Sequence, residues 1–324
     1  MVFMKLPNLK TSIKFIVSVT ILVLLLLTQL DFTILAQEAR SSNIWLMIVS
    51  LMLIICQIFF LNLRWHELLN GAKRNIPFKI SSLINIMGYI ANIIFITSIG
   101  GIITKSGLAV QQGLSVTQSI FVTLIDRFMT MIALIIFSAL GLIFLNGILD
   151  NNMVTSLSLF ISGILMVMIL FFLGIMRFDI FNKIVPSNCK NADLIQLLKD
   201  YTGNNDLIIK TCIYSLIAQS CFFLSVYVLS LGIETEINTI GFFALLPILA
   251  LISSMPISFG GWGVREGAFI YGLHLIGFPP ESAFLLSIQI GFITLIAPFL
   301  VGLPYLLQSD LRDIVLRKNK LSQN

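Results

Sequence analysis

Long stretches without a charged residue are the feature that most constrains how this chain can fold. Eight such runs follow one another along the 324 residues, and all but the first exceed 20 residues. A helix needs about 20 apolar residues to cross the hydrocarbon core of a bilayer, whereas barrel strands give alternating segments of about 10. The sequence therefore predicts an all-α polytopic membrane protein. The runs cover residues 15–30, 41–63, 80–104, 128–149, 154–176, 211–233, 237–264 and 282–309.

The composition excludes a water-facing fold and, with it, most ordinary enzymes. Hydrophobic residues make up 57% of the chain and charged residues only 11%, against about 25% charged residues in soluble domains. The net charge of +5 is expected for cytoplasmic loops, and we expect no nucleic-acid partner. The four cysteines form no CxxC pair and there are only two histidines, so we expect no disulfide framework, no metal and no cofactor.

Lysine and arginine in the short loops predict the orientation, because they favour the cytoplasmic side. The segments rich in these residues are the N-terminus, 64–79, 177–206 and the C-terminal tail. The loops 31–43, 146–153 and 232–239 carry one Lys or Arg or none and should face outward. We therefore expect both termini in the cytoplasm, with the protein in the inner (cytoplasmic) membrane of the cell.

This orientation requires two of the runs to enter the membrane and return. The run 80–104 starts inside, yet the helix that ends near Asn146 finishes outside, and the same conflict arises over 240–277. Each place is predicted to be a re-entrant hairpin or a pair of broken half-helices, the two being oppositely oriented. A full span followed by a short return helix is the alternative. About six full spans then accompany the two hairpins, and non-helical backbone at this depth must line protein or a cavity.

The two predicted hairpins share a sequence pattern. Ser98–Gly107 aligns without a gap on Ser258–Gly267 as S-x-G-G-x-x-x-[KR]-x-G, at an offset of 160 residues. We interpret this as an inverted repeat, the arrangement in which many transporters bind substrate at the repeat interface. Within a single membrane domain covering 1–324, the repeats cover about 44–146 and 207–307, and the cytoplasmic loop 177–206 carries a short interfacial helix.

The shared pattern has the chemistry of an anion site. Adjacent glycines allow close approach of the backbone to a ligand, and the helix that follows presents unpaired N–H groups and a positive dipole end. Lys105 and Arg265 add one cation to each hairpin. A charge near the bilayer centre costs roughly 2.5 to 3.5 kcal/mol. This cost favours a functional role for the two cations, although both side chains could instead extend to the interface.

Asp126 and Arg127 form a second intramembrane pair of charges. Adjacent residues on a helix do not face each other, so we expect different partners: Arg265 for the acid, and Glu266 or a ligand anion for the base. A purely structural charge network is the alternative.

Two further polar positions receive a structural interpretation. Asn92 precedes the glycines of the first hairpin and is expected to form a hydrogen bond across helices, with headgroup binding as the alternative. Arg64 and Trp65 are interpreted as an interfacial belt without a ligand role. The complete predicted ligand-binding set is Asn92, Gly100, Gly101, Lys105, Asp126, Arg127, Ser258, Gly260, Gly261, Arg265 and Glu266.

The segment Pro256–Gly267 resembles the signature P-x-S-x-G-G-x-G-x-R-E-G of the lysylphosphatidylglycerol synthase transmembrane-region family, also called flippase-like membrane proteins. The Arg64–Trp65 and Asp126–Arg127 pairs support the resemblance, which extends over about 44–307. Where the family usually has a proline and an arginine in the first hairpin, this chain has Ile96 and Lys105.

The resemblance implies a flippase-like transporter that moves an anionic phospholipid, an aminoacylated lipid or a lipid-linked sugar between leaflets. A lipid- or glycan-synthesis enzyme is the partner that it implies. Only about 15 residues follow the last run, so we expect no fused catalytic domain and lean against an enzyme. The alternatives are a lipid-modifying transferase with Asp126 or Glu266 as base, and a non-catalytic partner of a synthase.

Overall fold

The computed structural model describes residues 42–71, 75–94, 98–177, 203–233, 238–255 and 262–307, together with Tyr201 and a few positions between 20 and 37. Within this part of the chain, five helices are long and apolar enough to cross a membrane. The prediction of an all-α polytopic membrane protein is therefore confirmed. These helices are α3 (Ile44–Gly71), α6 (Val116–Leu145), α7 (Asn151–Arg177), α10 (Asn205–Ser230) and α13 (Pro280–Leu307).

The long helices extend beyond the charge-free runs that predicted them. Helix α6 begins at Val116, twelve residues before the predicted run, because Ser115 and Gln118 form a reciprocal capping box. The Ser115 hydroxyl accepts the Gln118 N–H at 3.2 Å, and the Gln118 side chain accepts the Ser115 N–H at 3.0 Å. Such a box satisfies two backbone donors that a helix start leaves unpaired. Asp126 consequently lies well inside the helix.

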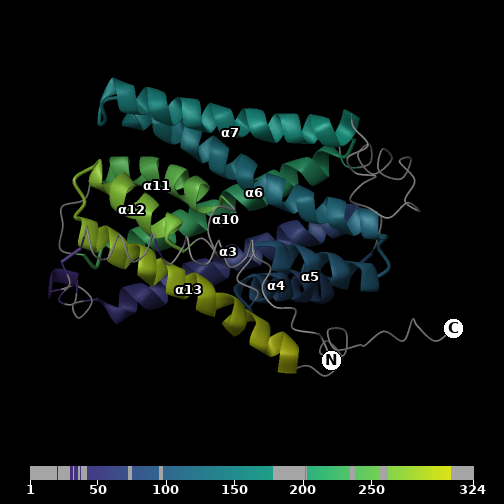
Figure 1. Cartoon of the computed structure of the whole chain (residues 1–324). Helices are drawn as coiled ribbons and strands as arrows, with labels where there is room; N and C mark the ends of the chain where they lie inside the picture. The colour runs from purple at the N-terminus through teal and green to yellow at the C-terminus, as the bar shows by residue number, and fades with distance from the viewer. Residues whose placement is uncertain are drawn as a thin grey trace. The chain divides into compact units, whose positions relative to one another are not determined.

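Four shorter helices form the two predicted breaks. Helix α4 (Phe78–Ile94) packs against α5 (Ser98–Gln111), and α11 (Thr239–Ser253) packs against α12 (Val264–His274) (Figure 1). The longest, α4, has 17 residues and rises about 25 Å, less than the hydrocarbon core of about 30 Å. These lengths favour pairs of half-helices over a full span with a short return helix. Their opposite orientation in the membrane stays a prediction.

The chain divides into two compact units that are interleaved in sequence. Unit 1 comprises Met1–Leu53, Met131–Phe172 and Ser220–Ile293, and unit 2 comprises Ile54–Thr130, Leu173–Gln219 and Thr294–Asn324. Unit 2 contains the pair α4–α5, and unit 1 contains the pair α11–α12. Each of the five long helices contributes residues to both units, and so does each predicted repeat.

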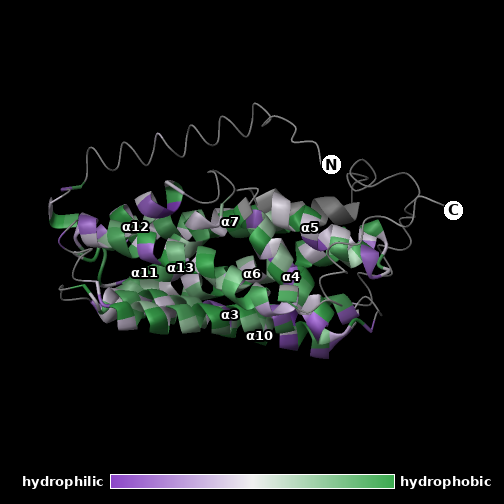
Figure 2. Cartoon of the chain, turned by 90° about the horizontal axis from the view of Figure 1, so that it is seen from below, coloured by the Kyte–Doolittle hydropathy of each residue, from purple (hydrophilic) through white to green (hydrophobic). Residues whose placement is uncertain are grey.

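Apolar side chains fill both units. In unit 2 the core includes Trp65, Leu69 and Phe121, and the Tyr201 hydroxyl donates to the carbonyl of Leu68. In unit 1, Phe242 and other side chains of α11 and α12 are buried. Figure 2 shows the helices hydrophobic along most of their length, with hydrophilic residues toward their ends. Large hydrophobic side chains are exposed on each of the five long helices, which is typical of surfaces that contact lipid.

Two predicted elements lie mostly outside the described residues. The first span, 15–30, is described only at isolated positions, and the loop 177–206, where an interfacial helix is predicted, only at 177, 201 and from 203 onward.

Candidate functional site

The carboxylate of Asp126 joins two cations in the interior of unit 2. Its Oδ1 accepts hydrogen bonds from Arg64 Nε at 2.9 Å and from Arg64 Nη2 at 2.7 Å. Its Oδ2 accepts a hydrogen bond from Lys105 Nζ at 3.0 Å. All three side chains are at most 5% exposed. We call Arg64, Lys105 and Asp126 the ion cluster.

Helix α3 carries Arg64 into the ion cluster, and this corrects the prediction of an interfacial belt. The helix continues to Gly71, eight residues past the apolar run, so Arg64 faces packed protein instead of the headgroup region. Its remaining donors reach the hydroxyls of Ser215 at 3.0 Å and Thr130 at 2.9 Å. The neighbouring Trp65 is fully buried. Arg64 is the main site residue that the sequence interpretation missed.

Helix α5 holds Lys105 against two aromatic rings. Its Nζ lies 4.8 Å from the ring centroid of Trp65 and 4.9 Å from that of Tyr89, within the range of a cation–π interaction. A Cβ at Gly88 would lie 2.5 Å from the Lys105 side chain, so this glycine makes the room that the lysine occupies. Lys105 is 3% exposed, which excludes the alternative that it extends to the interface.

The ion cluster carries more positive than negative charge. Arg64 and Lys105 share one carboxylate, and Arg127, the next residue along α6, is half-buried. Arg127 directly follows Asp126 in the sequence, and it forms no ion pair with a carboxylate among the described residues. The expected pairing of Asp126 with Arg265 is wrong, because the carboxylate already binds two cations of its own unit.

Gly101 of the first hairpin serves helix packing. Gly100 and Gly101 lie within α5, two and three residues after its start, and not in the turn. A Cβ at Gly101 would lie 2.5 Å from the Gly88 carbonyl oxygen and 2.3 Å from Asn92 Oδ1. The Gly101 N–H donates to Asn92 Oδ1 at 2.7 Å, which confirms the predicted interhelical hydrogen bond of Asn92. The Gly101 amide is therefore bound by protein and is not free for a ligand.

Arg265 and Glu266 form a second, separate ion pair inside unit 1. Arg265 Nη2 donates to Glu266 Oε1 at 2.7 Å, and Arg265 Nε lies 3.2 Å from the hydroxyl of Ser287. The guanidinium carbon lies 4.6 Å from the ring centroid of Trp262. Glu266 is fully buried, whereas the Arg265 side chain is 16% exposed. This pair is electrically neutral.

Two glycines shape the second site. Gly263, the residue before α12, has a φ of +83°, a conformation that costs other residues energy. Its N–H donates to Glu266 Oε2 at 2.5 Å, which fixes the carboxylate at the helix start. A Cβ at Gly291 would lie 2.2 Å from Arg265 Nη2. The predicted ligands Ser258, Gly260 and Gly261 lie outside the described residues.

The structure thus divides the predicted site residues between the two units. Lys105 and Asp126 come together in unit 2, with Arg127 beside them, and Arg265 contacts Glu266 in unit 1. Sequence reasoning missed Arg64, Tyr89 and Ser287. Arg64 directly follows an apolar run, and a helix continued by two turns would have placed it inside the protein. Tyr89 and Ser287 carry no comparable local signal.

The comparison with known families agrees with the signature motif. The sequence profile described as "Lysylphosphatidylglycerol synthase TM region" matches residues 12–302. No curated protein matches the chain. The match covers most of the chain, including both broken helix pairs, the ion cluster and the Arg265–Glu266 pair. The chain belongs to the lysylphosphatidylglycerol synthase transmembrane-region family, and is a multi-pass membrane protein related to lipid modification or transport.

Proposed function

We propose that the protein is a flippase-like transporter that moves a lipid with an anionic headgroup between the leaflets of the inner membrane, with both termini in the cytoplasm. An anionic phospholipid, an aminoacylated lipid and a lipid-linked sugar all carry the phosphate that this proposal needs. A lipid- or glycan-synthesis enzyme is the proposed partner, since it would supply the substrate. The observation that carries the proposal is the excess positive charge around Asp126.

The charge balance explains why an anion would be bound there. Buried charges are tolerated in an apolar interior only when they are paired. Asp126 neutralises one of its two bound cations, and Arg127, the next residue on α6, adds a further positive charge. A phosphate would compensate this excess, and Arg127 could bind it with charge-assisted hydrogen bonds while keeping its α6 position. We assign Arg127 as the first phosphate contact and the ion cluster as the source of the attracting field.

The geometry gives less support to a transferase. A general base must be able to accept a substrate proton. Cations bound to a carboxylate stabilise its ionised form and occupy the oxygens that would accept this proton. Asp126 accepts three hydrogen bonds from Arg64 and Lys105, and Glu266 is bound by Arg265 and Gly263. Both acids have structural partners in place of a substrate proton.

A leaflet-exchange assay tests the proposal. Proteoliposomes contain phosphatidylglycerol with a fluorescent acyl chain, and dithionite bleaches only the outer leaflet, so a transporter increases the bleached fraction. We expect Arg127→Gln to slow exchange about tenfold or more, the effect of losing one hydrogen bond between charged groups. Lys79→Gln removes the same charge from an exposed position on α4 and should keep the wild-type rate.

Two results would contradict the proposal. One is an equal exchange rate for Arg127→Gln and Lys79→Gln. The other is equally fast exchange of a fluorescent glucosylceramide, which has no phosphate. Both variants are first compared by gel filtration and thermal unfolding, so that a folding defect is not mistaken for loss of transport.

A further inference from the structure

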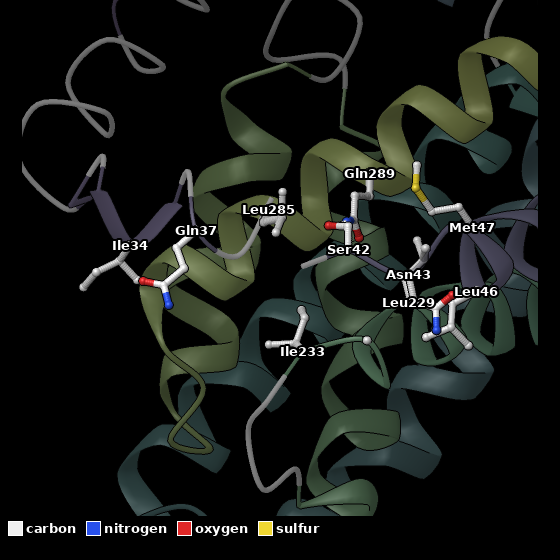
Figure 3. Close-up of a pocket in the computed structure, with 11 residues that line it drawn as sticks. Ile34, Gln37, Ser42, Asn43, Leu46, Met47, Leu229, Ile233, Leu285 and Gln289 are labelled. Carbon is white, nitrogen blue, oxygen red and sulfur yellow. The ribbon is translucent and has the colours of Figure 1, made fainter. Parts of the chain in front are cut away.

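Unit 1 contains a pocket of about 310 Å³ whose lining includes no residue of the ion cluster or of the Arg265–Glu266 pair (Figure 3). Three helix ends form it: the first turn of α3, the last turn of α10 and the second and third turns of α13. Ile34 and Gln37 close one side. Because helices that cross a membrane end at its surface, a pocket among their ends lies at the level of the lipid headgroups. Trp45, 71% exposed on the first turn of α3, is the type of residue enriched at that level.

The pocket lining is polar but uncharged. None of its lining residues is Lys, Arg, Asp, Glu or His, and four carry an amide or a hydroxyl: Gln37, Ser42, Asn43 and Gln289. The others are aliphatic residues, a methionine and a glycine. An anionic headgroup would find no counter-charge here, and a purely apolar chain would leave the amides without hydrogen-bond partners, which is unfavourable.

The amides of the pocket keep hydrogen-bonding capacity. Gln289 Nε2 donates to Ser42 Oγ at 2.9 Å, and Asn43 Oδ1 accepts the Trp45 N–H at 2.9 Å. Within the described residues, Gln289 Oε1, Asn43 Nδ2 and the whole Gln37 amide form no hydrogen bond. The lining therefore offers both donors and acceptors. A hydroxyl group also donates and accepts, so it can pair with either kind.

We infer that this pocket binds a neutral group rich in hydroxyls, such as the sugar or glycerol moiety of an uncharged lipid. Its volume is at the lower end of the 300–1,000 Å³ typical of ligand pockets, which suits a single sugar. The aliphatic part of the lining would contact the carbon skeleton, and Gln37, Asn43 and Gln289 would bind the hydroxyls.

This site is distinct from the residues of the proposed transport function. Leu285 and Gln289 are four residues apart and share one face of α13, and both line the pocket. Ser287, which contacts Arg265, lies two residues from each and so on a different face. The inference uses no residue of the ion cluster, and either conclusion can fail without the other.

A crosslinking experiment on the full chain in nanodiscs tests the inference. The probe is monoglucosyl diacylglycerol with a diazirine on the acyl chain near the headgroup, and the crosslinked peptides are identified by mass spectrometry. We expect crosslinks in residues 34–47, 229–233 and 285–289. Gln289→Met keeps the side-chain length but removes the amide, and should weaken probe binding about fivefold, as for one hydrogen bond. Gln111→Met, at the exposed end of α5, is the matched control.

Competition identifies the source of the hydroxyl group. Unlabelled glucosyl lipid that competes where free glucose does not would support a lipid headgroup site, and competition by glucose or glycerol would support a soluble polyol in the same site. Equal competition by phosphatidylglycerol and the glucosyl lipid would overturn the inference. So would wild-type crosslinks outside the three segments, a result that does not depend on the folding of any variant.

Discussion

Removal of the Asp126 charge should destabilise the protein strongly. Both oxygens of this carboxylate are in use, with Oδ1 bound by Arg64 and Oδ2 by Lys105. In Asp126→Asn an amide NH₂ replaces one oxygen and points its N–H groups at a cationic donor. Both cations then lie buried without a counter-charge. Breaking a buried ion pair in this way costs about 3–5 kcal/mol, and we expect a loss of stability in this range.

The substitution Lys105→Met, which removes a cation instead of the carboxylate, should destabilise the protein only slightly. Lys105→Met removes one cation and leaves Arg64 and Asp126 as a one-to-one pair, with an apolar chain of similar volume against Gly88. Its cost should be below about 1.5 kcal/mol. Added to Asp126→Asn, it removes one of the two unpaired cations and should restore roughly 1–3 kcal/mol, the coupling typical of residues in one network.

Unfolding in mixed micelles of a mild detergent and SDS, followed by far-ultraviolet circular dichroism, measures these differences. Asp206→Asn is the control, because Asp206 forms a 2.7 Å pair with Lys210 in which both side chains are exposed. Such a surface pair contributes about 0–1 kcal/mol. The reasoning is refuted if Asp126→Asn and Asp206→Asn are equally stable, or if Lys105→Met does not relieve the defect of Asp126→Asn.

Two glycine substitutions test the helix contacts of the hairpins. Gly101→Ala places a methyl group against Asn92 and the Gly88 carbonyl and should cost about 1–3 kcal/mol of stability. The control Gly107→Ala, whose methyl group meets nothing within 4 Å, should be neutral or slightly stabilising. Equal unfolding midpoints for the two variants would refute the packing role of Gly101. Gly263→Ala forces an alanine into a positive φ and should cost about 1–2 kcal/mol, measured as a lower thermal midpoint; an unchanged midpoint would show that this turn relaxes freely.

The helices and their breaks could be predicted from the sequence because each depends on local chemistry. Charge-free runs must form helices in a membrane, since every backbone polar group needs an internal partner. The charges of the loops then required the breaks near residues 95 and 256, and the structure has shorter helices at both places. Helix ends were less predictable. A charged residue ended each predicted run, but α3 and α6 bury charged residues within their helical length.

The glycine motif shows a different limit of sequence reasoning. Its two glycines in the first hairpin indicated a close backbone approach, which is correct for Gly101, but the group that approaches Gly101 is the α4 helix and not a ligand. A glycine pattern predicts that some group packs closely against the backbone, but it does not identify that group. The sequence also predicted Glu266 as a partner of Arg127, whereas in the structure Glu266 pairs with the adjacent Arg265.

The sequence by itself determined that this chain is a helical membrane protein of one family, with two interrupted helices and a few costly charges directly beside its apolar runs. The tertiary structure alone decided how those charges pair. Arg64 and Asp126 are 62 residues apart and meet because faces of α3, α5 and α6 converge on one point. A charge in an apolar interior must find a counter-charge, but which one it finds depends on helix packing, which no local pattern specifies.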